Sequence, residues 1–280
     1  MNKKKKVALV IGSGAIKCVS SIGLFQALSE EKISVDLVVG CSGGAIYGSG
    51  VSLGMSLDEI IKWSELTWTK DLMQDYTLNL KASKDGTLKF NERSGLVNDS
   101  YLNSKLREIL SDTAFSDLKL PFIVVATDMM NGEPVELSTG KIFDAIRASL
   151  AIPLIFPPWE LDGRLLIDGA ASNPLPIDIA IQNGADIVIA MGFKVDYRKR
   201  FRSITAVQEQ MTSIYMNNIL KNSFAFNNLA HHSEIFPIVP EFDTTVSMFD
   251  IHKIPHIIEK GREATIEQIP HIKRLLEKDT

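Results

Sequence analysis

A small-residue segment contains the serine whose surroundings best fit a nucleophile. Gly40-Cys41-Ser42-Gly43-Gly44 has the pattern G-x-S-x-G and lies between an apolar run, Leu37–Val39, and a helical run that begins at Ala45. A serine in such a strand-to-helix turn is presented at the tip of a strained bend, and the flanking glycines leave room for neighbouring backbones. The following helix adds unpaired N–H groups and its positive dipole end. The pattern predicts an activated Ser42; a glycine-rich turn that only packs tightly is the alternative.

A second loop of small residues follows the apolar run Val7–Ile11. Its sequence is Gly12-Ser13-Gly14-Ala15-Ile16-Lys17-Cys18. A dinucleotide-binding fingerprint that starts at Gly12 needs a glycine where Lys17 stands. A phosphate-binding P-loop needs a glycine and then a lysine where Lys17 and Cys18 stand. Both interpretations fail, which leaves an oxyanion hole made by successive backbone N–H groups.

The base that takes the proton of Ser42 is either an aspartate or a histidine. Asp168 follows an apolar run and begins the turn Asp168-Gly169-Ala170, and an aspartate within hydrogen-bonding reach can accept a serine proton directly. An ordinary Asp-Gly turn is the alternative. The chain order also permits a triad with a late histidine. We favour Asp168 and interpret the histidines as surface or packing residues; they are His231, His232, His252, His256 and His271.

The elements that position these residues are predicted from hydrophobic runs and spacing. Apolar, β-branched runs predict strands at Val7–Ile11, Leu37–Val39, Phe122–Ala126 and Ile187–Met191. They lack period-two alternation, which indicates strands buried on both faces, as in a parallel sheet. Helical spacing between the strands predicts an α/β fold with helices on both faces. Turn residues also predict hairpins within 122–137 and 161–167.

Several further motifs occur in one order along residues 7–195, and together with the two loops they resemble the patatin-like phospholipase family. The Ser42 segment is similar to the serine elbow of that family, and the loop around Gly14 is similar to its oxyanion loop, which is followed by a basic residue. The other matching segments are Ala126-Thr127-Asp128, Ala145–Pro153, Phe156-Pro157-Pro158, Asp168-Gly169-Ala170 and Asn173-Pro174-Leu175-Pro176.

The resemblance implies a three-layer α/β/α sandwich with a mostly parallel central sheet. It implies a serine acyl hydrolase of the phospholipase A or lysophospholipase type, in which Ser42 is the nucleophile and Asp168 the base of a dyad. It further implies a lipid ester substrate and no metal or cofactor. The remaining implied site residues are the oxyanion-hole positions Ser13, Gly14 and Ala15 and the supporting residues Lys17, Gly40, Gly44 and Gly169.

The chain departs from the family pattern in its oxyanion loop. Ser13, Ala15 and Cys18 stand where the family has glycine. If these positions need a left-handed backbone, each costs about 1–2 kcal/mol. The alternative function is therefore a weakly active or inactive lipid-binding regulatory protein. Lys17 is expected either to support the loop or to hold an acidic lipid head group.

We expect the chain to form one domain over 1–280. Two divergent segments show fewer of the apolar runs that predict strands than the rest of the chain. They span roughly 53–116 and 194–232 and are expected to be insertions or caps. The second contains apolar residues at helical spacing, for which we favour a face turned toward the core over a lipid-facing lid. These residues are Val207, Met211, Ile214, Tyr215 and Ile219.

Composition excludes several classes of protein. The chain has 280 residues, and its 45% of hydrophobic residues is typical of a globular protein. Its net charge of −4 argues against a general nucleic-acid binder, which would be basic. It contains no apolar run long enough to predict a transmembrane helix. Two cysteines, Cys18 and Cys41, cannot form a disulfide framework, and we expect buried, reduced thiols rather than a redox pair. A cytoplasmic protein that contacts membranes is expected; its lipid and oligomeric state stay open.

Overall fold

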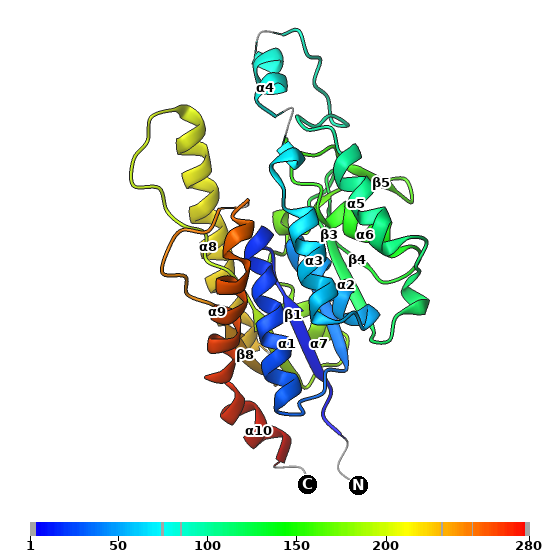
Figure 1. Ribbon diagram of the computed structural model, residues 1–280, viewed down its shortest axis with the longest axis vertical. Coiled ribbons are helices and arrows are strands. Elements are labelled where there is room, and N and C mark those ends of the chain that lie inside the picture. Colours follow the sequence, from blue (N-terminus) through cyan, green and yellow to red (C-terminus); the bar gives the residue numbers. More distant parts are fainter. Residues whose placement is uncertain (1–3, 74–75, 85, 231, 248, 278–280) are drawn as a thin grey trace.

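The central sheet has eight strands in the computed structural model, which describes residues 4–73, 76–84, 86–230, 232–247 and 249–277 (Figure 1). Strands β1, β2, β3, β7 and β8 run parallel, and β4, β5 and β6 join by antiparallel pairing. In spatial order the strands are β5 (Trp159–Leu161), β6 (Arg164–Asp168), β3 (Phe122–Asp128), β2 (Leu37–Cys41), β1 (Val7–Ile11), β7 (Ile187–Met191) and β8 (Glu234–Ile238), with β4 (Pro134–Leu137) also paired to β3.

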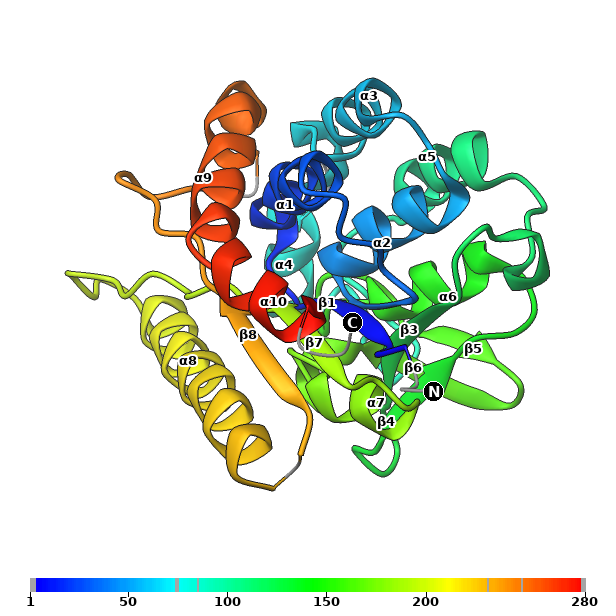
Figure 2. The same ribbon diagram turned by 90° about the horizontal axis from the view of Figure 1, so that it is seen from below.

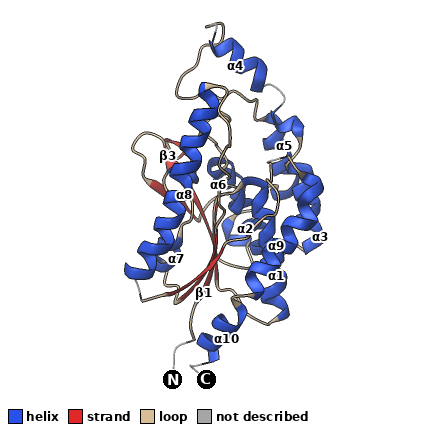
Figure 3. Cartoon of the chain, turned by 90° about the vertical axis from the view of Figure 1, so that its left-hand side faces the viewer, coloured by secondary structure: helices blue, strands red, loops and turns tan. Residues whose placement is uncertain are grey.

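Helices cover both faces of the sheet (Figures 2 and 3). One face carries α1 (Ser20–Glu30), α2 (Gly43–Leu53), α3 (Leu57–Thr67), α5 (Ser100–Leu110), α6 (Ile142–Ser149) and α9 (Ile254–Ile266). The other face carries α7 (Ile177–Gln182), and α8 (Ile204–Ala230) packs against α7 and β8. At opposite ends of the molecule lie α4 (Tyr76–Lys84) and α10 (Ile269–Glu277). The three-layer α/β/α arrangement is confirmed.

The core lies on both sides of the sheet because the side chains of each strand alternate between the faces. In β1, Leu9 and Ile11 pack with the α1, α2 and α9 layer, whereas Ala8 and Val10 pack with α7. All residues of β1, β2, β3 and β7 are buried. This explains why the runs that predicted these strands are apolar at every position instead of at every second one.

The predicted strands and hairpins are confirmed, with small differences at their ends. β1 and β7 have the predicted bounds, and β2 and β3 each extend two residues further. The predicted hairpins form as β3 with β4 and β5 with β6. The chain after residue 232, which forms β8, α9 and α10, carried no predicted element.

Both divergent segments, 53–116 and 194–232, are largely helical, and the expectation that the apolar face of the second segment turns toward the core is wrong. The segment 53–116 contains α3, α4, α5 and the short helix η2 (Lys70–Met73). The segment 194–232 contains α8, on which Val207, Met211 and Tyr215 are 48%, 41% and 57% exposed. The stripe that we expected to face the core therefore faces solvent at these three positions. Helical spacing identifies a helix but not which of two apolar faces packs inward.

Candidate active site

Ser42 occupies a strained turn between β2 and α2. Its backbone has φ 54° and ψ −126°, a left-handed conformation that a non-glycine residue adopts at a cost of about 1–3 kcal/mol. The Ser42 N–H donates to Ser149 Oγ at 2.8 Å, and Ser149 Oγ donates to the Val125 carbonyl at 2.6 Å. This chain of hydrogen bonds ties the turn to β3 and holds the strained conformation in place.

Two of the predicted supporting glycines lie where a side chain cannot fit. A Cβ on Gly44 would meet the Ile11 carbonyl oxygen at 2.1 Å, and one on Gly169 would meet the Val125 carbonyl oxygen at 2.2 Å. Gly44 therefore lets α2 begin directly against the end of β1. Gly169 lets the turn after Asp168 lie directly on β3.

The sheet brings Ser42 and Asp168 together from positions 126 residues apart in the chain. Cys41 pairs with Val125, and Asp168 pairs with Ala126, the next residue of β3. Ser42 and Asp168 consequently stand at the same level on the two sides of β3. Ser42 Oγ donates to Asp168 Oδ2 at 2.7 Å, and the two residues are only 6% and 4% exposed.

The second carboxylate oxygen of Asp168 is also held. Asp168 Oδ1 accepts from the Ala170 N–H at 2.8 Å, and the Thr127 hydroxyl donates to the Asp168 carbonyl at 3.0 Å. Burial raises the pKa of Asp168 to about 6, although the hydrogen bonds from Ser42 and Ala170 act in the opposite direction. A carboxylate with this pKa is ionised at neutral pH and is a better proton acceptor than an exposed aspartate.

The small-residue loop after β1 lies against the Ser42 turn. A Cβ on Gly43 would meet the Ala15 carbonyl oxygen at 2.6 Å. Ala15 has φ 48°, so this one substitution for glycine carries the expected strain, whereas Ser13 and Cys18 lie outside the left-handed region. The Ser13 N–H donates to the Pro174 carbonyl at 2.8 Å. The Ser13 N–H is therefore already bonded within the protein. Among the described residues this sets it apart from Gly14 and Ala15, the other two positions predicted to form the oxyanion hole.

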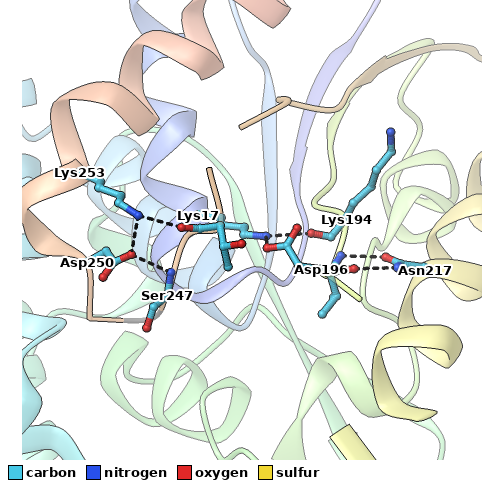
Figure 4. A network of polar contacts seen from close by, with 9 residues as sticks. Lys17, Lys194, Asp196, Asn217, Ser247, Asp250 and Lys253 are labelled. Carbon is cyan, nitrogen blue, oxygen red and sulfur yellow. Dashed lines mark hydrogen bonds and ion pairs between the residues drawn. The ribbon is translucent and has the colours of Figure 1, made fainter. Parts of the chain in front are cut away.

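Lys17 connects this loop to the chain that follows β7 (Figure 4). Its Nζ donates to the Lys194 carbonyl at 3.0 Å and to Asp196 Oδ2 at 3.3 Å, and it lies 5.7 Å from the centre of the Phe242 ring. The Lys17 side chain is 12% exposed. These contacts favour the supporting role of Lys17 over the capture of a head group.

A small apolar cavity of about 20 Å³ borders Ser42. This volume holds about one water molecule, so the cavity must widen before a larger molecule can enter. Ala15 and Ile46 line it next to the serine, and the divergent segment 53–116 contributes Thr67, Trp68, Leu72 and Leu102. The loop after α6 contributes Leu150, Ile152 and Phe156.

The other predicted residues lie as follows. Cys18 and Cys41 are buried free thiols, and burial raises the pKa of both. Among the histidines, His232, His252 and His271 are exposed, and His256 Nε2 lies 3.8 Å from Asp243 Oδ2. His231 lies outside the described residues.

Sequence reasoning missed two supporting side chains. Ser149 was part of a matched segment but carried no role, and nothing in its neighbours indicates that it binds Ser42. Arg147 is fully buried, and its Nη2 donates to Asp99 Oδ2 at 2.6 Å and to the Pro157 carbonyl at 3.0 Å. It joins α5 to the loop that carries Phe156. The available signal was a charged residue among the apolar residues of α6. A buried charge is almost always paired, so this residue could have been predicted to bind a partner inside the protein.

Comparison with known proteins identifies the family of the chain. A family model described as patatin-like phospholipase matches residues 9–181. An uncharacterized NTE family protein of Mycobacterium bovis is 30% identical over 220 residues, which cover 79% of this chain and 57% of that protein. Patatin-like phospholipase domain-containing protein 7 of Rattus norvegicus is 30% identical over 187 residues, 66% of this chain and 13% of that protein.

Among solved structures, human GIVD cytosolic phospholipase A2 aligns with 99% of this chain and 63% of its own, at a TM-score of 0.53 and 11% identity. That likeness concerns the fold. The chain spans just over half the length of its mycobacterial relative and a small part of the rat protein. The family model covers more than half of the chain and includes both the Ser42 turn and Asp168. The chain belongs to the patatin-like phospholipase family.

Proposed function

We propose that the chain is a serine hydrolase of lipid esters that uses Ser42 and Asp168 as a catalytic dyad. The observation that carries the proposal is the 2.7 Å hydrogen bond from Ser42 Oγ to a buried carboxylate, with the serine held in a strained turn. The family to which the chain belongs and its likeness to a cytosolic phospholipase A2 fold support the same reaction class.

In the first half of the reaction Ser42 Oγ attacks the ester carbonyl carbon, and its proton passes to Asp168 Oδ2. The bond between the carbonyl carbon and the leaving oxygen then breaks, and Asp168 returns the proton to the departing alcohol. The product is an acyl group on Ser42. In the second half a water molecule gives a proton to Asp168 and attacks the acyl carbon. The fatty acid leaves as Ser42 Oγ recovers the proton.

Charge that develops on the carbonyl oxygen needs donors on the other side of Ser42. In this proposal Gly14 and Ala15 supply backbone N–H groups, since Ala15 borders the same cavity as Ser42 and the Ser13 N–H is donated to Pro174. Loss of one such donor typically lowers the rate by about 10²–10³. In this proposal the left-handed backbone conformation of Ala15 costs free energy, and the fold tolerates that cost because the conformation directs the N–H groups of this loop toward the serine.

The apolar cavity is proposed to receive the acyl chain. Trp68, Leu72 and Phe156 are each less than 5% exposed and line the cavity that borders the serine. An acyl chain would replace contacts among these side chains with contacts to itself. The phospholipase A or lysophospholipase type is the form of the reaction that we propose.

A fluorophosphonate probe tests the serine assignment directly. The purified chain is incubated with the probe, and the adduct is mapped by peptide mass spectrometry, because Cys41 is adjacent. We expect a stoichiometric adduct on Ser42 that is absent in Ser42→Ala and strongly reduced in Asp168→Asn. The matched controls are the exposed residues Ser138→Ala and Asp162→Asn, which should label like the wild type. A folded wild-type chain without an adduct on Ser42 would overturn the proposal and favour a lipid-binding protein.

A further inference from the structure

The loop between β7 and α8 has a charge opposite to that of the chain. Residues 194–203 contain five basic residues and one acidic residue, a local net charge of +4 in a chain of net charge −4. Every residue in this loop is exposed. The aromatic rings of Tyr197 and Phe201 lie among the charges and are 56% and 51% exposed. The basic residues are Lys194, Arg198, Lys199, Arg200 and Arg202.

The loop continues into a helix with an apolar outer face. In a helix of 3.6 residues per turn, the exposed large apolar residues of α8 fall within a stripe about 100° wide. The opposite face packs inward through Ala206, Ser213, Leu220 and Asn227, which are spaced seven residues apart and buried. The stripe consists of Ile204, Val207, Met211, Tyr215, Phe226 and Leu229, with exposed fractions from 41% to 89%.

Internal contacts hold the loop between α8 and the small-residue loop that follows β1. Asn217 on α8 binds both backbone groups of Val195, with its Oδ1 accepting from the N–H at 2.8 Å and its Nδ2 donating to the carbonyl at 2.8 Å. On its other side, Lys17 of the oxyanion loop binds Lys194 and Asp196 (Figure 4). The loop and the first turns of α8 lie at the end of the molecule opposite the two termini, where the parallel strands end (Figure 1).

We infer that the loop 194–203 and the apolar stripe of α8 form a docking surface for a membrane rich in anionic phospholipids. Clustered basic residues are attracted to anionic head groups, while aromatic rings and an apolar helix face enter the boundary between head groups and acyl chains. Charge complementarity, with the aromatic and apolar residues beside the charges, decides the occupant: two copies that met symmetrically through this surface would bring together two loops of the same positive charge. The inference rests on the proposed function in one respect: the docking surface would serve to place Ser42 beside its lipid substrate. Membrane binding itself does not require the serine.

Vesicle binding tests the surface. The full chain is sedimented with vesicles of phosphatidylcholine alone or mixed with phosphatidylglycerol, and the bound fraction is measured against lipid concentration at low and high salt. We expect binding to the mixed vesicles that weakens with salt. Each basic residue near an anionic surface strengthens binding about fivefold, so Lys199→Glu/Arg200→Glu/Arg202→Glu should weaken it by about 100-fold or more. Tyr197→Ser/Phe201→Ser should weaken it while leaving its salt dependence intact.

The controls separate this inference from the proposed hydrolase. Lys32→Glu/Lys62→Glu/Arg274→Glu makes the same change in net charge at exposed positions elsewhere in the chain and should bind like the wild type. Ser42→Ala should also bind like the wild type, so a failure of the hydrolase proposal leaves vesicle binding unchanged. Thermal unfolding checks that each variant is folded. Equal binding to both vesicle types, an equal loss in the control triple variant, or a dimer that buries the α8 stripe would overturn the inference.

Discussion

Replacement of Asp168 by asparagine is expected to abolish turnover and yet stabilise the fold at neutral pH. Asparagine keeps the shape of the aspartate and can exchange hydrogen bonds with Ser42 and with the Ala170 N–H, but it cannot accept the serine proton. It also removes a buried ionised group. The two effects have one cause, since the burial that makes Asp168 a stronger base also makes its charged form costly.

The size of the stabilisation follows from the pKa of Asp168. It lies near 6 in the folded chain, against 3.8 for an ordinary aspartate in the unfolded chain. Because the folded-state pKa is raised, the folded chain binds the proton more tightly, and wild-type stability falls as pH rises from about 4 to about 6. The full difference is about 3 kcal/mol above pH 6. The asparagine side chain does not titrate, so the variant should gain stability relative to the wild type across that interval and keep it at pH 7.5.

Urea denaturation and thermal unfolding of both chains between pH 4 and pH 8 measure this difference. A gain of about 3 kcal/mol corresponds to a rise in melting temperature of roughly 5–10 °C at pH 7.5 for a chain of this size, and to almost none at pH 4. Ser42→Ala is the matched control, because it removes a hydrogen bond to the carboxylate and should lower stability at pH 7.5. A variant that is no more stable than the wild type at pH 7.5, or a difference that does not change with pH, would refute the reasoning.

Four further outcomes are expected. Turnover of a short ester should rise about tenfold per pH unit below pH 6 and then level off, because Asp168 must be ionised to accept the proton; a flat pH–rate profile would contradict this. Ser149→Ala should lower kcat and cost about 1–3 kcal/mol in urea denaturation, whereas Ser52→Ala, whose buried hydroxyl has no partner among the described residues, should cost little. Because the cavity must widen to admit an acyl chain, the smaller side chain of Leu72→Ala should lower the KM for long-chain esters relative to the KM for short-chain esters. An unchanged ratio of the two KM values would show that Leu72 does not line the acyl pocket. Gly169→Ala should lose activity or fail to fold because its Cβ meets a carbonyl oxygen at 2.2 Å, whereas Gly163→Ala meets nothing within 4 Å and should cost only about 1–2 kcal/mol for its φ of 75°.

Tertiary structure, and not helical spacing, decided which side of α8 faces solvent. Its sequence has apolar residues on both faces, so the pattern of Val207, Met211 and Tyr215 fits either direction. The contact with β8 and α7 takes the face that contains Ala206 and Leu220. The outer stripe was left exposed, and the docking surface that we infer became visible only then.

The sequence by itself determined the type of fold and, with the family resemblance, predicted both residues of the proposed dyad. Uninterrupted apolar runs required strands buried on both faces, and glycines at 40, 44 and 169 marked turns where backbones approach closely. Only the tertiary structure decided that Ser42 and Asp168 meet, because the antiparallel register of β6 on β3 sets the level of Asp168. It also decided that Ser149 holds the serine turn and that Ser13 donates to Pro174. Such contacts join residues far apart in the chain, and their partners depend on how the strands and loops pack, which no local pattern of residue types encodes.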